Sequence, residues 1–236
     1  MELSRSIDLY CERVDASFWS EPINALSNSA FIVAAWLLAF ALRRMQRKGQ
    51  DIPPVVRVMP VLLTQVGVCS FLFHTFATVA TGLADQFAIL LFGCVFLFAF
   101  LRQLCDVSWP VALTVSLGFG LISYLTPKSL PSGFLNQSGA YFPYLLGLVG
   151  MLVWLYVQHR KTSRLFLAGV ILFCVALTLR SIDQWICPMF PVGTHFLWHL
   201  LNGAVLLLLS LSLAQESAAP ANSLAPSGRE SIARQM

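Results

Sequence analysis

Three of the four histidines in this sequence have spacings suited to binding a metal ion. His195 and His199 are four residues apart in the segment H-F-L-W-H, a spacing that places two side chains on one face of a helix, about 5–6 Å apart. His74 follows Ser70 at the same spacing in S-F-L-F-H. A catalytic zinc ion takes three protein ligands and a water molecule. A single histidine in an apolar helix would more simply be a hydrogen-bond partner of another helix, but three near segment ends predict a zinc site.

A carboxylate and a hydroxyl accompany the histidines. Asp85 follows His74 after a short connection and begins another apolar run. It is expected to be a metal ligand, a base for a metal-bound water, or a cap at the start of its helix. Ser70 alone would be a small packing residue, but its register with His74 favours a hydroxyl that donates to a developing oxyanion.

The start of the first apolar segment carries a polar stripe. Glu21, Asn24 and Asn28 recur at i, i+3 and i+7, and the acidic residues of the preceding segment lie close by in sequence. One interpretation is a helix start followed by packing amides. The other is a cation site, because Ca²⁺ takes six to eight carboxylate and carbonyl oxygens, although the spacing matches no EF-hand loop.

The composition predicts that these groups lie in a membrane. The chain has 236 residues, of which 57% are hydrophobic and 11% charged, and soluble domains carry about 25% charged residues. The mean hydropathy is +0.74. The net charge of +4 requires no nucleic-acid partner. We therefore predict an all-α polytopic membrane protein.

Seven segments approach the roughly 20 apolar residues needed to cross a bilayer. The predicted spans are 22–43, 57–78, 83–103, 109–126, 141–159, 165–182 and 193–214. Residues 1–215 are predicted to form one seven-helix bundle. Residues 216–236 are small, polar and contain proline, which predicts a disordered cytoplasmic tail.

Charge predicts the orientation of the bundle. Most of the 15 basic residues fall in the first, third and fifth connections and in the tail, so the positive-inside rule places the N-terminus outside and the C-terminus inside. His74, Asp85 and His195 then converge on the periplasmic or lumenal leaflet, while His159 lies at the inner end of its helix.

The predicted orientation also identifies one pair of cysteines that could form a disulfide. Of the six cysteines, only Cys11 and Cys187 belong to outer aqueous segments, so they are the one pair expected to be oxidised. Arg180 and Asp183, at the outer end of the sixth span, are expected to form an ion pair or to support the site.

Three sequence blocks together resemble the alkaline ceramidase family, part of a superfamily of seven-helix membrane hydrolases. The blocks are Y-C-E-R with W-S-E-P-I-N-A-L-S-N, G-V-C-S-F-L-F-H with the later aspartate, and H-F-L-W-H. The resemblance implies zinc ligands at His74, His195 and His199, with Ser70 and Asp85 as catalytic partners. It also implies a calcium ion, with Asp8, Glu12 and Glu21 at the matching positions.

The expected reaction is metal-assisted hydrolysis of an N-acyl bond in ceramide or a related N-acyl lipid, giving a fatty acid and a sphingoid-type amine. Zinc would activate water, Asp85 would carry its proton to the leaving amine, and Ser70 would stabilise the oxyanion. One alternative is a receptor of the adiponectin-receptor type with a structural or weakly hydrolytic zinc site. The other is an ion transporter, but the inner halves of the helices offer almost no carboxylates or histidines for a path.

Overall fold

The computed structural model describes residues 2–131 and 133–220. Its helices are α1 (Pro22–Ser27), α2 (Ser29–Arg47), α3 (Pro54–Arg57), α4 (Met59–Phe76), α5 (Val79–Gln103), α6 (Trp109–Ser129), α7 (Phe142–Val157), α8 (Ser163–Ile186) and α9 (His195–Ser217), with a 3₁₀ turn η1 (Ser138–Tyr141). The two-residue strands β1 (Gln50–Asp51) and β2 (Ala219–Pro220) pair antiparallel.

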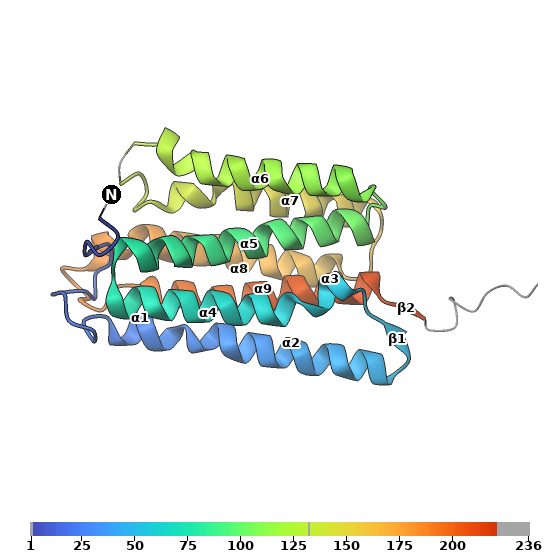
Figure 1. The fold of residues 1–236 in the computed structure, drawn as a ribbon, viewed down its shortest axis with the longest axis horizontal. Helices are drawn as coiled ribbons and strands as arrows, with labels where there is room; N and C mark the ends of the chain where they lie inside the picture. Colours follow the sequence, from blue (N-terminus) through green and yellow to red (C-terminus); the bar gives the residue numbers. More distant parts are fainter. Residues whose placement is uncertain (1, 132, 221–236) are drawn as a thin grey trace, which may run out of the picture.

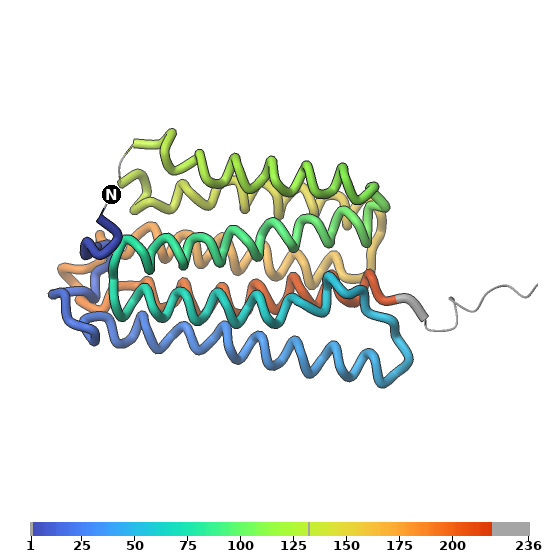
Figure 2. The backbone as a smooth tube through the Cα atoms, viewed as in Figure 1, coloured from blue at the N-terminus to red at the C-terminus, as the bar shows by residue number. Residues whose placement is uncertain are grey.

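Seven helical units are long and apolar enough to cross a membrane, as predicted: α1 with α2, α3 with α4, α5, α6, η1 with α7, α8 and α9. They lie side by side in one bundle, with α6 and α7 along one edge and α2 along the other (Figure 1). The chain begins at one end of the bundle, and α9 finishes at the opposite end (Figure 2). Which end faces the cytoplasm stays a prediction.

Most helix boundaries differ from the prediction by a few residues, and two of the differences bear on the site. The predicted span 22–43 is interrupted at Asn28, where the Ser27 hydroxyl and the Asn28 amide both donate to the Asn24 carbonyl and compete with the backbone. The predicted span 83–103 begins earlier, at Val79, because Thr78 and Thr81 form a capping box. Asp85 therefore lies in the second turn of α5 and is not a cap at its start.

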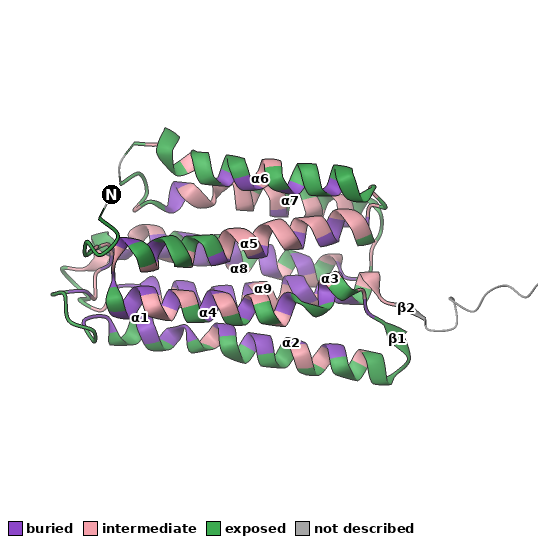
Figure 3. Cartoon of the chain, viewed as in Figure 1, coloured by how far each residue is buried: buried purple, intermediate pink, exposed green. Residues whose placement is uncertain are grey.

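The central helix of the bundle is α9, which packs against α8 and α2 and also touches α1, α4 and α5. In an apolar stretch of 18 residues, 50% of the residues of α9 are buried, compared with 22% of the residues in the corresponding stretch of α6. Buried residues line the inner faces of the helices, whereas α6 is largely exposed (Figure 3). Large exposed apolar side chains such as Trp36, Val61 and Leu146 are suited to contact with lipid.

The close approach of α9 to α2 depends on Gly203. A Cβ built at this position lies 3.0 Å from the backbone carbon, the carbonyl oxygen and the Cβ of Ala30. Gly203→Ala should therefore push the two helices apart and lower stability by about 1–3 kcal/mol. Thermal unfolding in detergent measures the effect. Gly150→Ala is the matched control, because its Cβ would meet nothing within 4 Å, and equal melting temperatures for the two variants would contradict the prediction.

The predicted tail lies mostly outside the described residues. Of its first residues, Glu216 and Ser217 belong to α9, and Glu216 accepts hydrogen bonds from the backbone and side chain of Thr162. Residues 221–236 lie beyond the part of the chain that the structure describes.

Candidate active site

Three histidines from two helices meet at the end of the bundle where the chain begins. His74 lies in the last turn of α4, and His195 and His199 occupy the first two turns of α9. Each is at most 2% exposed, and one ring nitrogen from each lies within 4.8 Å of the others. The ring centroids are 4.6–5.1 Å apart. The sequence predicted this convergence.

Two of the imidazoles are oriented by partners on the first span. His74 Nδ1 lies 2.6 Å from Glu21 Oε2, and His199 Nδ1 lies 2.8 Å from the Ser27 hydroxyl oxygen. A histidine that ligates a metal through Nε2 characteristically bonds a carboxylate or another polar group through its second nitrogen, which fixes the tautomer and the ring plane. Both rings therefore have Nε2 left for an ion.

The third imidazole is held by its backbone and by stacking. The His195 N–H donates to Asp183 Oδ1 at 2.9 Å, and the ring stacks on Tyr10 with centroids 3.6 Å apart. Its Nδ1 is buried without a hydrogen-bond partner. Because buried polar atoms are nearly always satisfied, this nitrogen indicates a missing ligand. Three buried imidazoles are also the donor set that zinc prefers, so the residues present fit a metal such as zinc.

Ser70 and Asp85 lie beside the histidine cluster at a similar depth. Ser70 precedes His74 by one turn of α4 and is 4% exposed. Its hydroxyl lies near the Asp85 carboxyl of α5. Asp85 Oδ1 is buried and accepts no hydrogen bond within the described residues, and Asp85 is not one of the clustered ligands. Asp85 therefore lies next to the histidine cluster without belonging to it.

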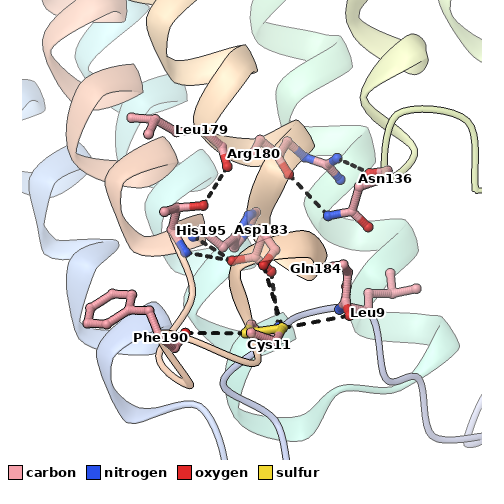
Figure 4. Close-up of a disulfide and its surroundings, with 11 residues drawn as sticks. Leu9, Cys11, Asn136, Leu179, Arg180, Asp183, Gln184, Phe190 and His195 are labelled. Carbon is pink, nitrogen blue, oxygen red and sulfur yellow. Dashed lines mark hydrogen bonds between the residues drawn. A yellow bond between two sulfur atoms is a disulfide. The ribbon is translucent and has the colours of Figure 1, made fainter.

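The expected ion pair between Arg180 and Asp183 does not form; Asp183 has a supporting role instead. Its carboxylate accepts the backbone N–H groups of Cys11, Thr194 and His195 at 2.7–3.0 Å. It lies between the N-terminal segment and the start of α9 (Figure 4). A carboxylate at a helix N-terminus is stabilised by the free N–H groups and by the helix dipole, which explains why Asp183 needs no cation.

Arg180 points away from Asp183 toward the aromatic side of the site. Its guanidinium donates to the Asn136 carbonyl at 2.6 Å and to the Ser138 hydroxyl at 3.1 Å. The rings of Tyr141 and Trp198 lie 5.2 and 5.7 Å from its central carbon. Arg180 therefore makes cation–π contacts in place of the ion pair, which was one of the two alternatives expected from the sequence.

The Cys11–Cys187 disulfide is confirmed (Figure 4). It joins residues 176 positions apart and fixes the N-terminal segment to the loop that precedes α9. Gly193 in this loop has a φ of +69°, and a Cβ there would overlap Asp183 Oδ1 and the Cβ of Cys11, so the tight approach requires glycine.

Cys187→Ser should lower stability by about 2–5 kcal/mol, because the cross-link restricts the unfolded chain over a long loop. The melting temperature should fall by several degrees, and the shift in gel mobility on reduction should disappear. Cys174→Ser, at an exposed free thiol, is the control. An unchanged melting temperature in Cys187→Ser would mean that the pair is not oxidised.

The acidic residues expected to bind calcium are not gathered around a common point. Asp8 is exposed, and the Glu12 carboxylate accepts the backbone N–H groups of Ile23 and Asn24 at 2.7 and 2.8 Å. Glu21 binds Arg13 and His74. The described residues contain one cluster suited to a metal, which is the histidine cluster.

Burial and these contacts shift the pKa values of titratable side chains in the N-terminal segment. Burial raises the pKa of the Tyr10 hydroxyl, which the nearby Arg180 guanidinium only partly offsets. Burial also raises the pKa of Glu12 against the effect of its two backbone donors. For Glu21, burial is outweighed by His74 and Arg13, which hold its pKa below the usual value, so this carboxylate is anionic.

An apolar cavity lies deeper in the bundle than the histidines. Its lining includes Phe31 of α2, Phe92 of α5, Tyr144 of α7, and Trp198 and Asn202 of α9. None of the three histidines lines the cavity, but the Phe31 ring lies 6.4 Å from the His199 ring, so the cavity wall approaches the cluster. Its surface is almost wholly apolar, which suits a hydrocarbon chain.

Comparison with known families agrees with this geometry. A family described as Ceramidase matches residues 5–220, nearly the whole of the described chain. The chain belongs to the ceramidase family. This membership supports a hydrolase of the ceramidase type and a multi-pass membrane protein. The chain matches no curated protein.

Sequence reasoning missed several residues that hold the site of this ceramidase-family protein together. Ser27 and Tyr10 contact His199 and His195, and Arg13 is buried against Glu21. Each contact joins residues in different segments, and Ser27 and His199 are 172 positions apart, so no local spacing predicts them. The one available signal was that Tyr10 and Arg13 belong to the Y-C-E-R block.

Proposed function

We propose that the protein is a zinc-dependent intramembrane amidase that hydrolyses the N-acyl bond of ceramide or a related N-acyl lipid. The observation that carries the proposal is the cluster of three buried imidazoles, with Ser70 and Asp85 beside it and an apolar cavity deeper in the bundle. Membership of the ceramidase family supports the same substrate class.

In the proposed amide hydrolysis, the histidine cluster, Asp85 and Ser70 each have a separate role. A divalent metal in the histidine cluster would supply a water of lowered pKa and polarise the amide carbonyl. The free Asp85 Oδ1 accepts the proton of the attacking water and delivers it to the leaving nitrogen. The Ser70 hydroxyl donates a hydrogen bond to the carbonyl oxygen as negative charge develops there. Cleavage of the C–N bond then gives a carboxylic acid and an amine.

The depth of the site supports a lipid substrate. His74 precedes the end of α4 by two residues, and Asp85 follows the start of α5 by six, so both lie within about 10 Å of the helix ends. An amide just below a lipid headgroup reaches this level, and its acyl chain would extend into the cavity lined by Phe92 and Trp198.

The direct test is fatty-acid release from a panel of N-acyl lipids by the purified protein, combined with elemental analysis. We expect about one zinc per chain and release of fatty acid from ceramide or a close relative, with loss of activity after chelation and recovery with zinc. Zinc without amidase activity on any lipid of the panel would contradict the proposal and favour a receptor. Flux of Zn²⁺ or H⁺ through liposomes that depends on His199 would favour a transporter.

We further propose that the active site faces the periplasmic or lumenal side, with the N-terminus outside and the end of α9 inside. The distribution of basic residues supports this orientation, and the disulfide at the site end suits an oxidising compartment. A membrane-impermeant thiol reagent should label a cysteine introduced at Asp8 in intact cells or sealed vesicles. Labelling of the cysteine at Asp8 only after lysis would contradict this orientation and place the N-terminus inside.

A further inference from the structure

A buried arginine pairs with Glu21, one of the carboxylates that was expected to bind calcium. Arg13 is 6% exposed, and its Nε forms an ion pair with Glu21 Oε1. Its Nη1 donates to the Asp15 carbonyl at 2.9 Å, and its Nη2 donates to the His74 carbonyl at 3.0 Å. One guanidinium therefore joins the N-terminal segment, the start of the first span and the end of α4.

The carboxylate oxygens of Glu12 and Glu21, which were expected to bind calcium, are already engaged. Glu21 Oε2 bonds His74 Nδ1 and the Asn24 amide, while Oε1 bonds Arg13. Glu12 caps the start of α1 with both of its carboxylate oxygens. The amide oxygens of Asn24 and Asn28 lack partners and could contribute to a calcium site, but they are neutral, and the two carboxylates beside them are already bound to other groups.

We propose that the Arg13 guanidinium takes the place of a calcium ion beside Glu21. Its guanidinium holds Glu21, and through Glu21 it orients His74, so that the histidine cluster keeps its geometry without calcium. Arg13 is thus a positioning residue that acts through Glu21. The guanidinium also supplies the positive charge that a buried carboxylate requires, since an unpaired buried charge is strongly destabilising.

The first test uses the unaltered protein and does not depend on lipid hydrolysis. A calcium titration to several millimolar, with magnesium as the control, should leave the melting temperature unchanged. A calcium site filled at 100 times its dissociation constant would raise the melting temperature by about 5–10 °C. A rise of this size with calcium and not with magnesium would overturn the proposal.

The second test measures how tightly the histidine cluster retains zinc. Arg13→Gln should transfer zinc to a colorimetric chelator about 10–100-fold faster than the unaltered protein, because Glu21 loses its cation and holds His74 less firmly. Arg13→Lys should recover part of the loss, since it keeps the charge but cannot reach all three acceptors. Arg5→Gln is the matched control, because Arg5 is an exposed cation of the same segment.

A purely structural role would lower the melting temperature without changing zinc transfer in the folded protein. Transfer from Arg13→Gln at the rate of the unaltered protein would therefore contradict the proposal. If Arg13→Gln does not fold, Arg13→Lys and the calcium titration still decide the question. Neither readout uses a lipid substrate, so failure of the amidase proposal and failure of this one are distinguishable.

Discussion

Replacing His199 by alanine should remove both the metal and the activity. His199 is 2% exposed, its ring lies 4.7 and 4.6 Å from the rings of His74 and His195, and its Nδ1 is held by Ser27. Loss of one of three protein ligands should weaken zinc binding by at least about 100-fold, a larger effect than the loss of an outer hydrogen-bond partner. Elemental analysis after dialysis should find almost no zinc, and fatty-acid release should fall to background.

The matched control for this variant is His159→Ala. His159 lies after α7 at the opposite end of the bundle, away from the cluster, so its loss should leave zinc content and hydrolysis unchanged. If His199→Ala retained a full complement of zinc, the metal would be bound elsewhere and the proposed site would be wrong. A variant without zinc that still hydrolysed lipid would remove the metal from the mechanism.

Asp85→Asn should abolish most of the activity while leaving the metal in place. The substitution keeps the shape of the side chain but removes the oxygen that accepts a proton, so the rate of hydrolysis should fall by about 10²–10⁴-fold. Because Asp85 is not among the clustered ligands, zinc content should be unchanged. Steady-state release of fatty acid and elemental analysis on the same sample measure both effects.

Asp106→Asn, at an exposed position at the far end of α5, is the control for Asp85→Asn. Loss of zinc together with activity in Asp85→Asn would show that Asp85 is a ligand and not a base. Full activity would mean that another group takes the proton.

The sequence by itself determined the class of the protein, its seven spans and the residue types of the metal site. These features are local: apolar length defines a span, and a spacing of four residues places His195 and His199 on one helical face. The convergence of His74 with this pair also followed from the sequence, because successive spans alternate in direction and their polar ends fall on the same side. The Cys11–Cys187 pair followed from the same alternation.

Only the tertiary structure decided which groups orient the histidines. Glu21 binds Arg13 and His74, Ser27 contacts His199, and Asp183 accepts N–H groups from both the N-terminal segment and α9. Sequence separation carries no information about such pairs, because they depend on the packing of α9 against its neighbours. From the sequence, Glu21 was a possible calcium ligand, and Asp183 was expected either to pair with Arg180 or to support the site. In the packed bundle Glu21 binds Arg13 and His74, and Asp183 takes the supporting role.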